Sequence, residues 1–183
     1  MLLTLLGTAS MFAAAHFDTV ASRTVVATPT VHSTPIVGIG AAVMADSIVV
    51  EKSKRTLTLY LAGAPVRSYR VALGKQPVGD KIRIGDNRTP EGMFFIDAKN
   101  PDSRYHRALH ISYPDAAHLA RASKLGVKPG NNIMVHGLPD QYASLGKEHR
   151  TFDWTEGCIA VTNREIEEIW RAIPMGAAIQ IKP

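Results

Sequence analysis

Polar and apolar residues alternate over short stretches of this chain, a pattern typical of strands that bury one face. The clearest case is residues 56–61, where Thr56, Thr58 and Tyr60 alternate with leucines. The Ala-Gly-Ala-Pro sequence at 62–65 predicts a hairpin turn after this strand. Further strands are predicted at residues 47–51, 66–73, 93–98, 108–112, 132–136, 158–161 and 177–181, with a turn-rich stretch at 74–92.

Two short helices are predicted from their capping residues. Asp115 can cap a helix over residues 116–125, which would stop at Gly126. Thr162 and Glu165 have the spacing of a capping box, and apolar residues recur at helical spacing behind it until Pro174. The predicted fold is therefore mainly β, a β-sandwich or mixed sheets with two short helices. Strands that do not alternate with helices argue against a parallel α/β fold.

The N-terminal part of the chain differs in character from the rest. Residues 1–20 are apolar and small and resemble a secretory signal or an anchor, although no positive charge precedes Arg23. The apolar run is short for a membrane span. Residues 21–45, rich in Thr, Val, Ala, Pro and Gly, are interpreted as a linker, and residues 46–183 as one domain. We therefore expect an exported protein that acts in the periplasm or cell envelope.

The most informative feature of the composition is the single cysteine, which limits the kinds of site that the chain can form. The chain has 183 residues, 45% of them hydrophobic, and a net charge of +5. That charge favours acidic partners, but without a Lys/Arg-rich run we expect no nucleic-acid binding. One cysteine allows no internal disulfide and argues against a cysteine-based zinc or redox site. Cys158 is then either an unused thiol or a nucleophile.

Cys158 directly follows Gly157, which allows an unusual backbone turn and the close approach of a substrate carbonyl. Backbone N–H groups at such a turn can face a developing oxyanion. A buried cysteine at the start of a strand, packed beside Ile159, explains the same residues equally well. The local sequence does not choose between these interpretations.

A cysteine nucleophile needs a base or a positive neighbour that populates its thiolate. The best candidate is His136, which ends an apolar strand and precedes Gly137. Taken alone, this histidine is better explained by a hydrogen bond to the backbone at a strand end. The polar segment at 138–151 is long enough to fold over a cleft between His136 and Cys158.

Three motifs in one chain resemble a known family. His136-Gly137 is followed by Thr155-Glu156-Gly157-Cys158, and Arg88-Thr89-Pro90-Glu91-Gly92 lies upstream of both. Residues 71–74 and 77–81 add further glycines, a proline and Lys81 to this pattern. Together they resemble the YkuD-type catalytic domain of the L,D-transpeptidases, and the resemblance extends over about residues 46–183.

The resemblance implies an activity and roles for the matching residues. Cys158 would attack a carbonyl of a peptidoglycan stem peptide, and His136 would be its base. The backbone N–H groups of Gly157 and Cys158 would bind the oxyanion, and the carbonyl of Gly137 would orient His136. No cofactor and no metal is implied.

Two positions depart from the family pattern. Glu156 stands where the family commonly has histidine, and Ala160 where it commonly has arginine or asparagine. Glu156 is suited to pair with a substrate amine, but it opposes thiolate formation unless it points away. Two alternatives therefore stay open. One is a hydrolase of the same fold, either a carboxypeptidase or an amidase that releases a wall-linked protein. The other is a non-catalytic module that binds the cell wall.

Further candidates for substrate binding are Glu156, Arg104, His106 and Trp154. A solvated basic edge explains Arg104 and His106 as well, and core packing explains Trp154. His106 and His110 have the spacing of a zinc pair on a helix, but their segment is strand-like and no carboxylate nearby completes a ligand set. We expect no metal there.

Overall fold

The computed structural model describes residues 44–183. The predicted signal or anchor segment at 1–20 and nearly all of the predicted linker at 21–45 lie outside the described residues. Among the helices of residues 44–183, none combines the length and the apolar character that a membrane crossing requires.

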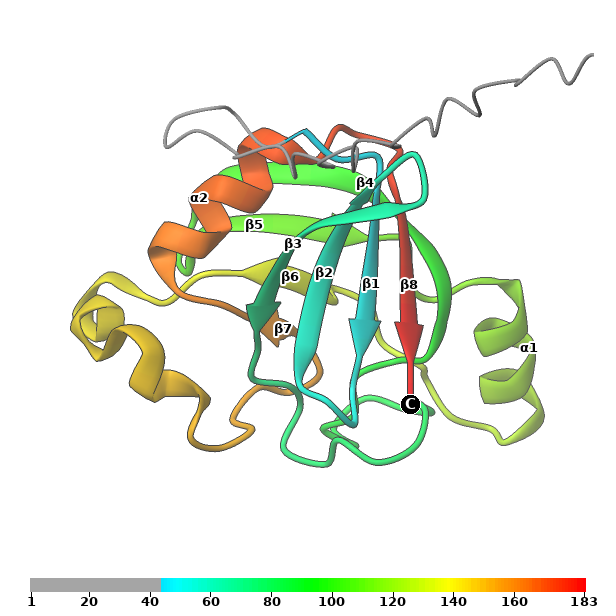
Figure 1. The fold of residues 1–183 in the computed structure, drawn as a ribbon. Helices are drawn as coiled ribbons and strands as arrows, with labels where there is room; N and C mark the ends of the chain where they lie inside the picture. Colours follow the sequence, from blue (N-terminus) through cyan, green and yellow to red (C-terminus); the bar gives the residue numbers. More distant parts are fainter. Residues whose placement is uncertain (1–43) are drawn as a thin grey trace, which may run out of the picture. The chain divides into compact units, whose positions relative to one another are not determined.

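Eight strands of the described region form one mixed sheet in the order β3-β2-β1-β8-β4-β5-β6-β7 (Figure 1). The strands are β1 Ser47–Glu51, β2 Thr56–Leu61, β3 Ala64–Arg70, β4 Gly92–Ser103, β5 His106–Ile111, β6 Met134–His136, β7 Ile159–Ala160 and β8 Ala178–Lys182. The helical segments are α1 Ala116–Lys124, the 3-10 segment η1 Asp140–Arg150 and α2 Asn163–Ala172. The mainly β fold with mixed sheet pairing is as the sequence predicts.

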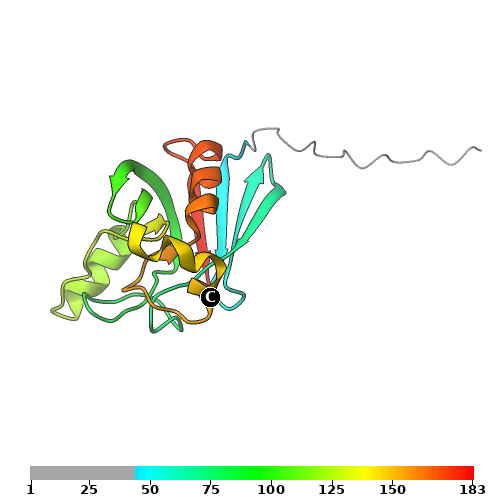
Figure 2. The ribbon, with the colours of Figure 1, turned by 90° about the vertical axis from the view of Figure 1, so that its left-hand side faces the viewer.

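β4 joins the two halves of the sheet. Its first residues, 92–95, pair with β8, and its later residues, from Ile96 to Ser103, pair with β5. Figures 1 and 2 show β4 curving out of the plane of β1, β2 and β8, so that β5, β6 and β7 run across that layer. Apolar side chains from both halves and from α2 form one buried core, which includes Val50, Leu57, Ile159 and Ile166.

The amphipathic strands and the helix caps follow the sequence closely. β1 and β2 have the predicted bounds, because their alternate residues are buried against the core. Asp115 caps α1 by accepting a hydrogen bond from the amide of His118, and Thr162 and Glu165 form the predicted capping box of α2. These local signals are sufficient because each depends on residues within one turn or one strand.

Several boundaries differ from the prediction. The turn before β3 is made by Ala62 and Gly63, both with positive φ, so β3 begins at Ala64 and already ends at Arg70. β4 extends to Ser103, well beyond its predicted end at residue 98. Its polar residues after 98 stay in the strand because they pair with β5. The segment 138–151, predicted as a loop, contains η1, which Gly146 interrupts with a φ of 47°.

The turn-rich stretch at 74–92 is held in place by Lys52, a buried lysine that directly follows β1. Lys52 is only 2% exposed. Its Nζ donates to the carbonyl oxygens of Gly79 at 2.7 Å and Thr89 at 2.9 Å, and to Glu91 Oε1 at 2.8 Å. Three acceptors satisfy all three N–H bonds of the ammonium group, so its burial is compensated. Lys52 thereby connects the Thr-Pro-Glu-Gly motif to the sheet.

Substitution of Lys52 by methionine should lower the free energy of unfolding by about 3 kcal/mol, because it leaves Glu91 and two carbonyls without their shared donor. Urea denaturation would measure the change. Lys54→Met is the matched control, since Lys54 is 65% exposed and pairs with Glu51 on the surface. This substitution should leave the free energy of unfolding close to the wild-type value, because an exposed ion pair contributes little. Equal effects of the two substitutions would contradict the anchoring role of Lys52.

Candidate functional site

The structure places His136 at the end of β6 and Cys158 directly before the neighbouring strand β7. β6 and β7 pair in parallel, with Val135 opposite Ile159 and His136 opposite Ala160. The sequence predicted that Cys158 begins this strand. In the structure Cys158 immediately precedes β7. Val135 and Ile159 are fully buried in the core, so strand alternation directs His136 and Cys158 to the other face.

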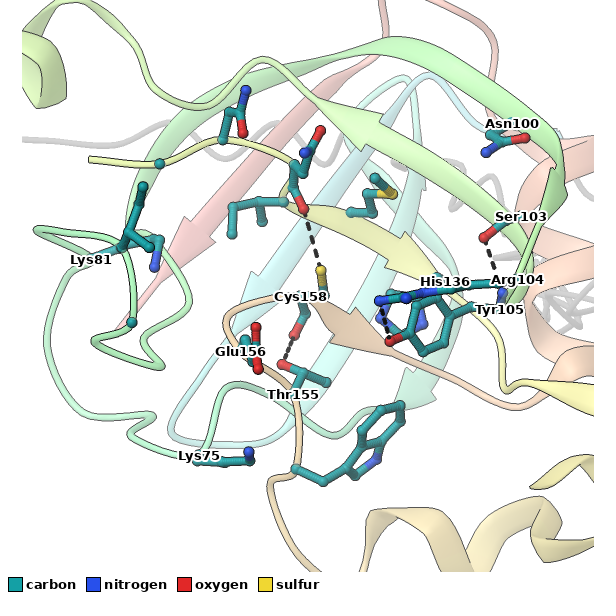
Figure 3. A pocket seen from close by; sticks show the side chains of 18 residues that line it. Lys75, Lys81, Asn100, Ser103, Arg104, Tyr105, His136, Thr155, Glu156 and Cys158 are labelled. Atoms are coloured by element: carbon teal, nitrogen blue, oxygen red, sulfur yellow. Dashed lines mark hydrogen bonds between the residues drawn. The ribbon is translucent and has the colours of Figure 1, made fainter. Parts of the chain in front are cut away.

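Both residues line a cavity of about 680 Å³. Figure 3 shows Cys158 near its middle, with Lys81 and Lys75 on one side and His136, Tyr105 and Arg104 on the other. The walls come from the turn-rich stretch at 74–92, the β4–β5 hairpin, residues 130–134 and residues 154–158. Four segments distant in sequence therefore meet around the single thiol.

His136 is held as a neutral imidazole with a defined tautomer. Its Nδ1 lies 2.7 Å from the carbonyl oxygen of Gly137. A carbonyl only accepts hydrogen bonds, so Nδ1 carries the proton and Nε2 of the neutral ring has a free lone pair. Burial lowers the pKa of His136 to about 4, although the Gly137 carbonyl opposes this, and His149 and Arg104 lower it slightly further. Nε2 is therefore available as a proton acceptor near neutral pH.

Aromatic side chains enclose the His136 ring. The Tyr105 ring lies 4.4 Å from it between centroids, and the Trp154 ring meets it edge to face at 5.9 Å. Trp154 Nε1 in turn donates to Nδ1 of the buried His149 at 3.4 Å. Burial lowers the pKa of His149 to about 4, so its ring is neutral, and because an indole N–H only donates, Nδ1 is the nitrogen that accepts. Tyr105 and His149 carry no sequence signal for this role, since only the tertiary fold brings them to His136.

The thiol of Cys158 is half-buried and neutral at rest. Burial raises its pKa, Glu156 adds to this, and the Met134 amide, Lys81 and Arg104 oppose it. Its Sγ donates to the carbonyl oxygen of Asn132 at 3.5 Å. The wall around Cys158 therefore disfavours a preformed thiolate.

Position 157 requires glycine, and the amide of Gly157 also makes a hydrogen bond. Its φ is 136°, and an added Cβ would lie 2.6 Å from the carbonyl oxygen of Arg88. Its amide donates to Thr155 Oγ1 at 3.1 Å, and this hydroxyl donates to the carbonyl oxygen of Cys158 at 2.8 Å. The Gly157 amide, a predicted oxyanion donor, thus already has an acceptor in this structure. The Cys158 amide remains the candidate donor.

Gly137 is required by close packing as well as by its carbonyl. A Cβ there would lie 2.6 Å from Asn163 Oδ1, at the start of α2, and 3.0 Å from the carbonyl oxygen of Tyr105. Asn163 Oδ1 accepts the amide of Leu138 at 2.6 Å and so fixes the chain leaving β6. The backbone that orients His136 is thus held by α2 and by the β4–β5 hairpin.

Three of the four predicted substrate-binding residues, Glu156, Arg104 and Trp154, line the cavity. His106 does not. Its Nε2 lies 3.0 Å from Glu167 Oε1 on α2, and Arg107 Nε donates to the same oxygen at 2.6 Å. The His106 side chain instead fastens β5 to α2. His110, the other histidine of the pair, instead contacts Asp97 at 2.5 Å.

Ala160, the second departure from the family pattern, does not border the cavity. It is fully buried. Its amide donates to the carbonyl oxygen of Ala72 at 2.9 Å, and the amide of Ala72 donates back to the carbonyl of Ala160 at 3.0 Å. Ala160 is therefore enclosed between β6 and residue 72, and it does not contribute a side chain to the cavity wall.

Lys81 is a cavity residue to which the sequence gave no individual role. It is 3% exposed, and its Nζ donates to Asp86 Oδ1 at 2.7 Å and to the carbonyl oxygen of Arg83 at 3.2 Å. Asp86 also accepts the amides of Ile82 and Arg83. This ion pair shapes the end of the cavity opposite His136, where Lys75 adds an exposed cation.

The same fold occurs in proteins whose structures have been solved. The helical cell shape determining protein Pgp2 of Campylobacter jejuni superimposes with a TM-score of 0.58 at 24% identity, over 77% of this chain and 48% of that one. Bd1075 of Bdellovibrio bacteriovorus gives a TM-score of 0.53 at 23% identity, over 75% and 48%. The fold class is that of the L,D-transpeptidase catalytic domain.

The chain belongs to the YkuD family of L,D-transpeptidase catalytic domains, whose model matches residues 45–181. It is also similar to the Escherichia coli protein named "Putative L,D-transpeptidase YafK", with 30% identity over 132 residues, which make up 69% of this chain and 46% of YafK. The chain thus spans about half the length of this relative.

Proposed function

We propose that the protein is a cysteine acyltransferase acting on peptidoglycan stem peptides, with residues 46–183 as its catalytic domain. Family membership supports the substrate class. The observation that carries the mechanism is the shared cavity of Cys158 and His136, in which the Gly137 carbonyl holds the proton on Nδ1 and leaves Nε2 as a base. Because this polymer lies in the cell envelope, we further propose that the protein acts there after export.

In the proposed mechanism Cys158 Sγ attacks the stem-peptide carbonyl while its proton passes to His136 Nε2. The Cys158 amide hydrogen-bonds the oxyanion of the tetrahedral intermediate. The carbon–nitrogen bond then breaks, the imidazolium gives its proton to the departing amine, and a thioester remains. A second amine attacks the thioester, loses its proton to His136, and expels Cys158, which recovers that proton.

Hydrolysis of the same thioester by water is the second candidate, giving a carboxypeptidase or an amidase that releases a wall-linked protein. Glu156 favours it. This carboxylate is exposed on the cavity wall two residues before Cys158, where it can attract a substrate that carries an amine. Incubation with purified muropeptides and mass spectrometry separates the outcomes. Cross-linked products support transpeptidation, trimmed or released products support hydrolysis, and unchanged substrate with Cys158 intact would support a non-catalytic wall-binding module.

The neutral resting pair predicts a distinct pH dependence of thiol alkylation. Because the pKa of Cys158 is raised, the thiolate fraction is small at pH 7, and the iodoacetamide rate should rise about tenfold per pH unit up to at least pH 9. Because His136 becomes protonated only near pH 4, kcat/KM should stay flat from about pH 5 to 8 and fall below that range. An alkylation plateau with a midpoint near pH 6 would instead indicate a thiolate–imidazolium pair at rest.

A further inference from the structure

A second cavity, of about 720 Å³, adjoins the one that contains Cys158. It lies between η1 and the segment at 151–154. Its walls are mainly apolar side chains, namely Leu138, Pro139, Tyr142, Leu145 and Phe152. Arg104, Tyr105 and Trp154 line both cavities. The two spaces therefore share the wall that encloses the His136 ring.

Three of the apolar residues of the second cavity are unusually exposed, whereas Leu138 is buried. Tyr142 is 53% exposed, Leu145 47% and Phe152 65%. Clustered around one concave surface, they leave apolar area in water that an apolar ligand would cover. Nothing in the acyl-transfer chemistry of Cys158 requires this surface, so its use must lie in binding.

The chemistry indicates which part of a substrate reaches this cavity. The acyl carbon must bond to Cys158 Sγ, and the amine nitrogen must lie next to His136, which exchanges its proton. Figure 3 shows His136, Tyr105 and Arg104 together on one side of Cys158, and Lys81 on the opposite side. The acyl part therefore extends toward Lys81, and the amine part toward the wall formed by Tyr105 and Trp154.

We propose that the second cavity binds the amine component of the reaction, and that this component is a peptide segment with apolar side chains. This inference rests on the proposed function. A single D-alanine has one methyl group and would leave a cavity of about 720 Å³ nearly empty. Several apolar side chains of a peptide would fill it and cover Tyr142, Leu145 and Phe152.

The test compares two substrates with the same acyl group. One carries D-alanine as the leaving amine, and the other carries a six-residue peptide that contains leucine and phenylalanine. Wild-type protein should show the higher kcat/KM with the peptide amine. Leu145→Glu should reduce the ratio of the two kcat/KM values at least tenfold, mainly through KM, because the peptide amine would lose the burial of one leucine side chain. An unchanged ratio would overturn the proposal.

Leu119→Glu is the matched control, since Leu119 is 51% exposed on α1 and lines neither cavity. It should leave the ratio at the wild-type value. Calorimetry with the Cys158→Ala protein and the free hexapeptide amide tests binding without turnover, and Leu145→Glu should abolish this binding. If neither substrate reacts, the proposed function fails, and the calorimetry alone decides the inference. Absence of binding to Cys158→Ala would then overturn it.

Discussion

Substitution of Cys158 by alanine should reduce turnover of a stem peptide by at least about 10,000-fold, because no other group of the cavity can form the thioester. The fold should remain intact, since Cys158 is half-buried and its Sγ makes only a 3.5 Å contact to Asn132. We expect the midpoint of thermal unfolding to change by only a few degrees. Mass spectrometry of the reaction products measures the loss.

Cys158→Ser distinguishes the chemistry of the thiol from its shape. The serine hydroxyl stays protonated beside His136, whose pKa of about 4 makes it a weak base. We therefore expect this variant to be nearly as inactive as Cys158→Ala. If either variant kept more than about a tenth of the wild-type rate, the covalent mechanism would be wrong.

Replacement of His136 by glutamine should lower kcat/KM about 100- to 10,000-fold at pH 7, the range for loss of a general base. The expected loss is large because the Cys158 thiol, with its raised pKa, depends on His136 to remove its proton during attack. The remaining activity should rise about tenfold per pH unit as hydroxide forms the thiolate. Wild-type activity should stay flat from about pH 5 to 8.

His110→Gln is the control for this experiment. His110 pairs with Asp97 and does not line the cavity, so its replacement should leave both the rate and the pH profile unchanged. The pH profile separates loss of the base from a general disturbance of the site. A His136→Gln protein whose reduced rate were independent of pH would argue against proton transfer through His136.

Sequence reasoning predicted the parts of the fold that depend on neighbouring residues. Alternation gave β1 and β2 their bounds, and Asp115 and Thr162 marked the starts of α1 and α2. The sequence pattern did not predict η1, whose apolar residues do not recur at a clear helical spacing. It also did not predict the end of β4. Both depend on tertiary structure, since the polar end of β4 is extended by its pairing with β5.

The candidate site also has features that the sequence predicts and features that depend on the tertiary fold. The motifs around Gly137 and Gly157 identified His136 and Cys158, which the structure places in one cavity. The burial that raises the pKa of Cys158 and lowers that of His136 depends on the whole fold and could not be read from motifs. His106, although near Arg104 in sequence, faces α2 once the strand is formed and so lies outside the cavity, which the sequence alone could not indicate.

The position of β8 has a consequence for how the protein reaches its folded state. β8 lies between β1 and β4 and is the strand through which β3, β2 and β1 are connected to the strands that carry His136 and Cys158. Its residues, 178–182, are synthesised after those of every other strand, and they pair with β1, about 130 residues earlier. Such non-local pairing slows folding. The growing chain therefore cannot join β1 to β4 within this sheet until β8 has been made.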